Sequence, residues 1–250
     1  MDRNIVILAI SEKNGNYCVA GIDVDTGKWA RPYSDFKDIE GAVPENHLIY
    51  PNGNHVQIFD IVRIREEQPC YNSVQPENFF YDNGRKWRYI DKLTLHKTVL
   101  LHDFDYRNEI FFSRERRLTQ EEVDKVIDRE SLLMLYVTNL EVIVNESSRD
   151  GHKRFKLNFD CEGIHYFEFA IGDIKVRKLY ENKSVGKYKF CDKAIIIFSL
   201  TDKFKDCRYY KMAAQFLIWN SWKDQTSIFF SIIAIFIITN NSFKNYHCYF

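Results

Sequence analysis

The chain has 250 residues, enough for one large domain or two small ones, and its formal net charge at pH 7 is zero. A neutral chain has no overall field that would draw it to DNA or to an acidic membrane. With 45% hydrophobic and 28% charged residues, 10 Gly and 5 Pro, the composition is that of a folded protein and excludes a low-complexity chain. Aromatic residues make up 16%, which favours β-strands, because pleated faces accommodate large flat rings.

Charge is distributed unevenly along the chain. Residues 149–193 carry 11 Lys and Arg against 7 Asp and Glu, whereas residues 101–148 carry 6 against 11. A polyanion site would therefore draw its charge from the second half or from local clusters. An ordinary solvated surface of mixed sign would show the same pattern.

The six cysteines form no C-x-x-C pair, and the histidines do not cluster beside them at ligand spacing. We therefore expect neither a metal site nor a cofactor. The N-terminus resembles no signal peptide, since Asp2 and Arg3 precede an apolar run of only six residues, 5–10. These features predict a cytoplasmic protein with reduced thiols.

The first third of the chain is rich in strand signals. Glycine-bearing turns separate three short apolar runs, and residues 57–66 alternate so that Val62 and Ile64 face inward while Arg63 and Arg65 face outward. The turn at Asn83-Gly84 precedes another run. The pattern predicts strands over residues 5–10, 17–23, 28–33, 57–66 and 87–96.

One helix is predicted at residues 119–128. Thr119 stands three residues before Glu122, the capping-box spacing in which each side chain satisfies the other residue's free backbone amide. Val123, Val126 and Ile127 supply an apolar face. We interpret residues 113–134 as a helical connector between a first unit at residues 1–112 and a second at residues 135–218.

Strand signals resume after this helix. Turns at Asp150-Gly151 and Glu162-Gly163 predict hairpins. Strands are expected over residues 135–145, 154–160, 165–171, 193–200 and 209–216. Two groups of about five strands suit two small β-barrels, so the expected fold is mainly β, with two barrels and a connecting helix.

Residues 219–250 form an atypical apolar tail. Residues 226–239 contain no charge, but a membrane-spanning helix needs about 20 apolar residues, so we expect no stable membrane span. A tail unrelated to the domain, a buried extra element and a membrane-associated segment remain open.

Four sequence blocks resemble the dual OB-fold containing domain family of bacterial proteins. They are IVILAISEKNGNYCVAGIDVDTGKWARPYS, VQIFDIVRI, NSVQPENF and FSLTDKFKDCRYYKMAAQF, in the family's order, over roughly residues 3–217. The last block departs from the family pattern, which is richer in glycine where this chain has residues 202–210. The resemblance implies two OB-like barrels and a nucleic-acid-binding role, with no established catalytic residue.

The opening block supplies the first candidate site. Trp29, Arg31 and Tyr33 alternate, so they can share one strand face, where an aromatic ring stacks on a base and an arginine holds phosphate. The alternative is that Trp29 is core and Arg31 pairs with a carboxylate such as Asp35.

Other candidates lie in loops and on a later strand. Lys13, in the first hairpin, can reach a phosphate, and Gln75 and Asn78 can read a base edge; a polar turn and a structural loop are the alternatives. Lys153, Arg154 and Lys156 form the densest basic patch, although strand edges also carry lysine to prevent edge pairing.

No arrangement of residues typical of catalysis occurs in the sequence. Our leading hypothesis is a non-enzymatic module that binds single-stranded or structured RNA or DNA. The alternative is a protein-interaction or small-ligand sensing domain, since a fold does not dictate a function.

Overall fold

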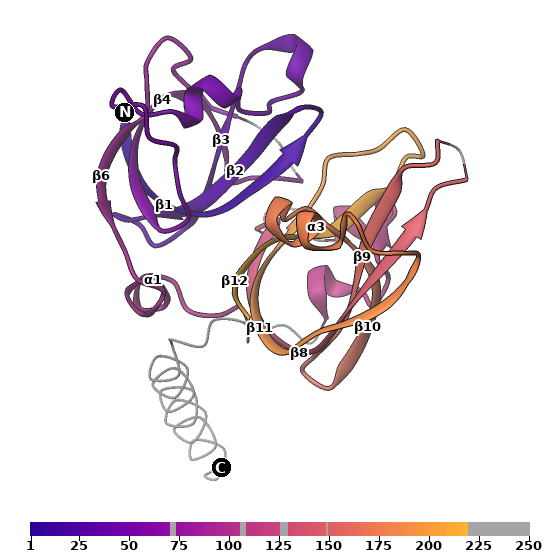
Figure 1. Cartoon of the computed structure of the whole chain (residues 1–250). Helices are drawn as coiled ribbons and strands as arrows, with labels where there is room; N and C mark the ends of the chain where they lie inside the picture. The colour runs from indigo at the N-terminus through magenta and orange to yellow at the C-terminus, as the bar shows by residue number, and fades with distance from the viewer. Residues whose placement is uncertain (71–73, 106–108, 126–129, 149, 220–250) are drawn as a thin grey trace, which may run out of the picture. The chain divides into compact units, whose positions relative to one another are not determined.

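The computed structural model describes residues 1–70, 74–105, 109–125, 130–148 and 150–219, with side chains to residue 217. Two separate six-stranded sheets account for most of this part of the chain, and each closes into a barrel (Figure 1). The mainly β fold with two OB-like barrels is therefore confirmed. Apart from residue 219 itself, the predicted apolar tail at residues 219–250 lies outside the described residues.

The first barrel contains six strands, of which five form the closed ring. Their order is β1-β2-β3-β5-β4, closed by antiparallel pairing of β1 with β4, and β3 runs parallel to β5. This is the five-stranded Greek-key arrangement of OB folds. The bounds are β1 Asp2–Lys13, β2 Asn16–Asp23, β3 Trp29–Tyr33, β4 Asp60–Pro69, β5 Asn78–Tyr81 and β6 Arg88–Lys92.

The alternation of side chains along β4 agrees with the sequence pattern. Val62 and Ile64 are buried in the barrel interior, and Arg63 and Arg65 lie on its outer side. Between β3 and β4 the chain forms two short 3-10 helices, η1 Lys37–Ile39 and η2 Glu45–Leu48.

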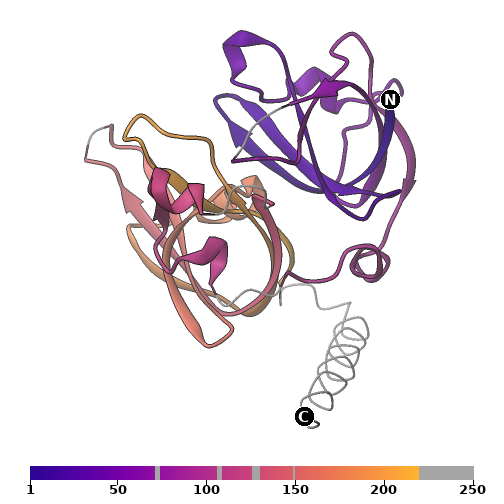
Figure 2. The same cartoon turned by 180° about the vertical axis from the view of Figure 1, so that it is seen from behind.

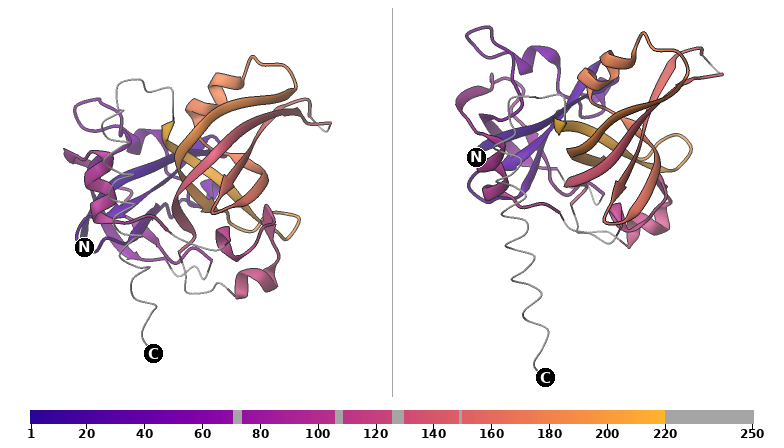
Figure 3. Two further views of the ribbon diagram at one scale, coloured as in Figure 1. Left: turned by 90° about the horizontal axis from the view of Figure 1, so that it is seen from below. Right: turned by 60° about the horizontal axis from the view of Figure 1, so that its bottom comes forward.

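The second barrel repeats the same topology. Its ring runs β8-β9-β10-β12-β11, closed by antiparallel pairing of β8 with β11, and β10 runs parallel to β12 (Figure 2). The bounds are β8 Leu132–Glu146, β9 Lys153–Cys161, β10 Ile164–Ile171, β11 Gly186–Leu200 and β12 Tyr209–Trp219. In Figure 3 the long β8–β9 hairpin, in pink, extends beyond the rest of this barrel.

A short helix, α3 (Ile174–Tyr180), lies between β10 and β11 in the chain. Asp173 begins it, because its Oδ1 accepts hydrogen bonds from the backbone N–H groups of Lys175 and Val176. The Oδ2 atom of Asp173 accepts from the backbone N–H of Phe216 at 2.9 Å, which fastens the helix to β12. Seven residues with one buried turn gave too weak a periodic signal to be predicted.

The helix with the predicted capping box exists as α2, Gln120–Asp124. Thr119 Oγ1 accepts from the backbone N–H of Glu122, and Glu122 Oε2 accepts from that of Thr119. Val123 packs in the interior of the second barrel, so α2 belongs to that barrel and is not a free connector.

The change from one core to the other occurs earlier than the expected boundary at residue 112. Ile110 and Phe111, in the short helix η3 (Ile110–Phe112), already belong to the second core, and the two-residue strand β7 (Arg117–Leu118) pairs with β12. The helix that follows the last strand of the first sheet is α1, Leu95–Leu101, where the strand predicted at residues 87–96 instead ends at Lys92. Thr94 begins α1, since its hydroxyl accepts from the backbone N–H of Lys97.

No helix among the described residues is both long enough and apolar enough to cross a membrane.

Candidate functional site

OB barrels bind oligonucleotides on the outer face of their second and third strands, flanked by the loop between strands one and two and the loop between strands four and five. In this chain those strands are β2 and β3 of the first barrel and β9 and β10 of the second. The two faces differ sharply in exposure.

The outer face of β2 and β3 is covered. Trp29, Arg31 and Tyr33 alternate on one face as predicted, but Trp29 is 3% exposed and Arg31 is 7% exposed. The Trp29 ring packs edge-on against His102 with ring centroids 5.1 Å apart, and Tyr33 lies edge-on to Phe80 at 5.8 Å. A nucleic acid does not reach side chains this deeply buried.

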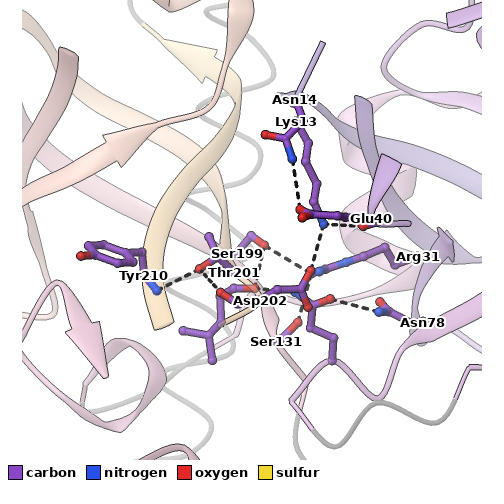
Figure 4. A network of polar contacts seen from close by, with 12 residues as sticks. Lys13, Asn14, Arg31, Glu40, Asn78, Ser131, Ser199, Thr201, Asp202 and Tyr210 are labelled. Atoms are coloured by element: carbon purple, nitrogen blue, oxygen red, sulfur yellow. Dashed lines mark hydrogen bonds and ion pairs between the residues drawn. The ribbon is translucent and has the colours of Figure 1, made fainter. Parts of the chain in front are cut away.

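Arg31 lies at a contact between the two barrels. Its Nη2 atom is 2.9 Å from Glu77 Oε1 and donates to the hydroxyls of Ser131 and Ser199 (Figure 4). Ser131 directly precedes β8 and Ser199 lies in β11, so both serines belong to the second barrel. Glu77 in turn accepts from the backbone N–H and hydroxyl of Ser131. The carboxylate partner proposed for Arg31 therefore exists, but it is Glu77 and not Asp35.

Gln75 and Asn78 take part in the same contact. Gln75 Nε2 donates to the carbonyl of Leu200 at 3.0 Å, and Asn78 Nδ2 donates to Gln75 Oε1 at 3.0 Å. They are 2% and 4% exposed. For Trp29, Arg31, Gln75 and Asn78 the predicted role as an exposed nucleic-acid surface is thus corrected: they are buried structural groups.

Lys13 also bridges the barrels. Its Nζ is 2.9 Å from Asp202 Oδ2, in the loop after β11, and donates to the carbonyl of Glu40 at 2.7 Å (Figure 4). Burial disfavours the ammonium ion, but Cys18 and Asp202 outweigh that effect and raise the pKa of Lys13. Through Lys13, the β1–β2 hairpin of the first barrel therefore contacts the loop between β11 and β12 of the second.

The three basic residues of β9 do not share one face of the strand. Lys153 Nζ donates to the carbonyls of Glu181 and Lys183, both at 2.7 Å, and so closes the end of α3. Arg154 pairs with Asp150 at 2.7 Å with half of its side chain exposed, and Lys156 pairs with Glu168 at 2.7 Å. Arg154 and Lys156 share the outer face of β9, and Lys153 does not.

A β-bulge on the neighbouring strand β10 forms a site that the sequence pattern does not predict. The pairing of β10 with β9 shifts between Tyr166 and Phe169, whose rings both pack in the barrel interior. Phe167 and Glu168 lie between them, and Glu168 has a left-handed backbone with φ of 54°. Bulges re-aim side chains, and here Phe167 is 60% exposed on the outer face.

Asn158 of the neighbouring strand β9 holds this bulge in place by a hydrogen bond. It is 4% exposed; its Oδ1 accepts the backbone N–H of Glu168 at 2.9 Å and its Nδ2 donates to Glu141 Oε2 at 3.0 Å. The conformation of Glu168 is strained for a residue with a side chain, and such strain persists only where neighbours hold it. The hydrogen bond from Glu168 to Asn158 provides that support.

The bulge forms one wall of a cavity of about 330 Å³ on the outer face of the second barrel. Apolar groups and polar groups both line it. The lining residues are Ile143, Asn145, Asn158, Phe167, Glu168, Val185, Gly186 and Lys187.

Charge at this site is mixed and partly neutralised. Glu168 Oε2 contacts both Lys156 and Arg116, and the hydrogen bond from Lys156 is the main reason that the pKa of Glu168 is lowered. Glu168 is therefore ionised at neutral pH. Lys187 also lines the cavity, with a largely exposed side chain whose Nζ lies 3.9 Å from Glu141 Oε2.

The sequence held one signal of this site. Tyr166, Phe167 and Phe169 cannot all lie on one side of a regular strand, so adjacent aromatic residues in HYFEFAI indicate a break in the alternation.

Residues 3–216 match the model of the family described as dual OB-containing domain. No curated protein and no solved structure matches the chain.

Proposed function

Since the chain belongs to the dual OB-containing domain family, we propose that it is a non-enzymatic module that binds single-stranded nucleic acid on the outer face of its second barrel. OB barrels offer the face of strands two and three to oligonucleotides. In the first barrel that face holds the buried Arg31 and Trp29, and in the second it carries the exposed ring of Phe167. The second barrel is therefore the binding barrel in this proposal.

The observation that carries the proposal is the combination of cations and an exposed aromatic ring on the outer face of adjacent strands. On β9, Arg154 is half exposed and Lys156 is partly exposed, and Phe167 is exposed on the neighbouring strand β10. Single-stranded nucleic acid is held by cations that follow the backbone and by rings on which bases stack, each stacked base contributing about 1–3 kcal/mol. The mixed charge of the chain favours short sites over long polyanion tracks.

Fluorescence anisotropy of labelled single-stranded and duplex oligonucleotides over a series of salt concentrations tests the proposal. Binding of the single strand that weakens as salt rises is expected, with each phosphate contact adding roughly 0.7 to the slope of log K against log salt. No binding of either DNA or RNA at low salt would contradict it.

A second candidate is a small-ligand sensing domain. The cavity of about 330 Å³ beside Phe167 favours it, because ligand pockets begin at about this size and combine apolar walls with a few polar groups. Saturable binding of a small molecule to a chain that binds no oligonucleotide would decide for this candidate.

A further inference from the structure

The cavity at the β10 bulge combines a carboxylate, a cation and an exposed aromatic ring. Its acceptor is the Glu168 carboxylate, whose contacts with Lys156 and Arg116 both fall on Oε2. Its cation is the Lys187 ammonium. Its exposed ring is Phe167, which stands edge-on to His165 with ring centroids 4.3 Å apart.

The acceptor of this cavity is held in a fixed position. The backbone at Glu168 is held left-handed by the hydrogen bond to Asn158, and Asn158 is itself held by Glu141. A carboxylate placed by a buried amide and a strained backbone is a pre-organised acceptor, which loses little entropy when it binds a ligand. The strain at Glu168 thus has an assignable use.

Unpaired bases are recognised by stacking on aromatic rings and by hydrogen bonds to their Watson–Crick edges. The guanine edge presents two adjacent donors, N1–H and the N2 amino group, next to the O6 acceptor. A carboxylate accepts from both donors at once, and an ammonium group donates to O6. Among the four bases, guanine alone offers two adjacent donor groups to a carboxylate, with an acceptor beside them for a cation.

We propose that the cavity at the β10 bulge is a guanine site, in which Phe167 stacks on the base, Glu168 accepts from N1–H and N2–H, and Lys187 donates to O6. The inference rests on the proposed function and deepens it, because it names the base that the second barrel reads. The same chemistry fits a guanine within a single strand and a free guanine nucleotide.

The test measures anisotropy of the full chain with three labelled strands of equal length. One contains only thymine, one has a single central guanine, and one has inosine in its place, which lacks the N2 amino group. The guanine strand is expected to bind about tenfold more tightly than the inosine strand, since a hydrogen bond to a charged acceptor contributes at least a factor of this size. Equal binding of all three strands would overturn the guanine site and leave the proposed function standing.

Variants assign the preference to named groups. Glu168→Gln is expected to reduce the difference between guanine and inosine to less than twofold, and Phe167→Leu to weaken binding of the guanine strand. Arg116→Gln is the matched control for Glu168→Gln, because Arg116 contacts the same carboxylate oxygen but does not line the cavity. Phe36→Leu is the control for loss of an exposed ring, as Phe36 is 46% exposed on the first barrel.

Direct titration of the full chain with GMP and with IMP, followed by calorimetry, separates the two sources of guanine. If GMP binds more tightly than IMP and no strand binds, the guanine site stands and the nucleic-acid proposal fails. If neither the strands nor GMP bind to a chain whose thermal melt is normal, both fail. A guanine preference that survives Glu168→Gln would overturn the assignment of Glu168.

Discussion

Arg31 and Glu77 form an ion pair at 2.9 Å, with the two side chains 8% and 2% exposed. The pair is surrounded by Ser131 and Ser199, so that an arginine of the first barrel is solvated by hydroxyls of the second. Two charges removed from water in this way depend on each other, because neither has solvent to replace its partner.

Glu77→Ala is therefore expected to destabilise the protein strongly, by about 3–5 kcal/mol, since it leaves the Arg31 guanidinium buried and unpaired. The double variant Arg31→Met with Glu77→Leu should lose much less, because no charge stays buried. Urea unfolding measures both. Arg85→Met is the control: that guanidinium is 62% exposed beside Asp82, and its removal should cost about 0–1 kcal/mol. A double variant as unstable as Glu77→Ala would contradict this account of the pair.

The divided basic patch on β9 predicts opposite phenotypes for neighbouring residues. Arg154→Ala should reduce the salt slope of oligonucleotide binding by roughly 0.7 while changing stability by less than about 0.5 kcal/mol. Lys153→Ala should leave the slope unchanged and lower stability by about 0.5–1.5 kcal/mol, because the hydrogen bonds that join β9 to the carbonyls of Glu181 and Lys183 are lost. Salt-dependent anisotropy and thermal melts on both variants make the comparison. Equal loss of slope in the two would refute the division.

Lys211 predicts a pH dependence of stability. Its Nζ donates to the carbonyls of Ile110 and Ser113, and it is 1% exposed. Burial lowers its pKa to about 7 from an ordinary value of 10.5, against the raising effect of Glu122 and other nearby carboxylates. Between these pH values the unfolded chain binds more protons at this site than the folded chain. The contribution of Lys211 to stability therefore rises with pH across that window, by at most about 1.4 kcal/mol per pH unit.

The measurement is the free energy of unfolding of the wild type and of Lys211→Met at several pH values from 7 to 10. The wild type should gain stability relative to the variant as pH rises, while an exposed control, Lys205→Met, shows a constant difference. A constant difference for Lys211→Met as well would mean that the folded lysine titrates at its ordinary pKa.

Local pattern predicted which side of a strand a residue occupies, but not what covers that side. Trp29 and Arg31 do lie on the outer face of β3, as their alternation indicates. The groups that bury Arg31 come from residues about 100 and 168 positions later in the chain, and no periodicity within β3 reports such a contact. For the same reason Gln75 could not be recognised as a donor to Leu200.

Strand regularity also limited what could be predicted of the candidate site. A register shift moves a side chain to the opposite face, so Phe167 and Glu168 share a face that strict alternation denies them. The capping box at Thr119, in contrast, depends only on two residues three positions apart, and the structure confirms it. A feature that depends on residues within one turn of the chain could be predicted from the sequence. A feature that depends on the pairing of two strands could not.

The covered face of the first barrel decides how the chain can be divided. Val6, Leu8 and Ile22 are fully buried yet lie outside the barrel's interior cluster, and β1 contacts β12 of the other barrel. A fragment ending after α1 would expose this apolar surface to water. Polar groups at the contact, such as Arg31 and Gln75, would lose their partners in the second barrel. We therefore expect the two barrels to unfold together, so gene fusions, domain swaps and truncations should keep them whole.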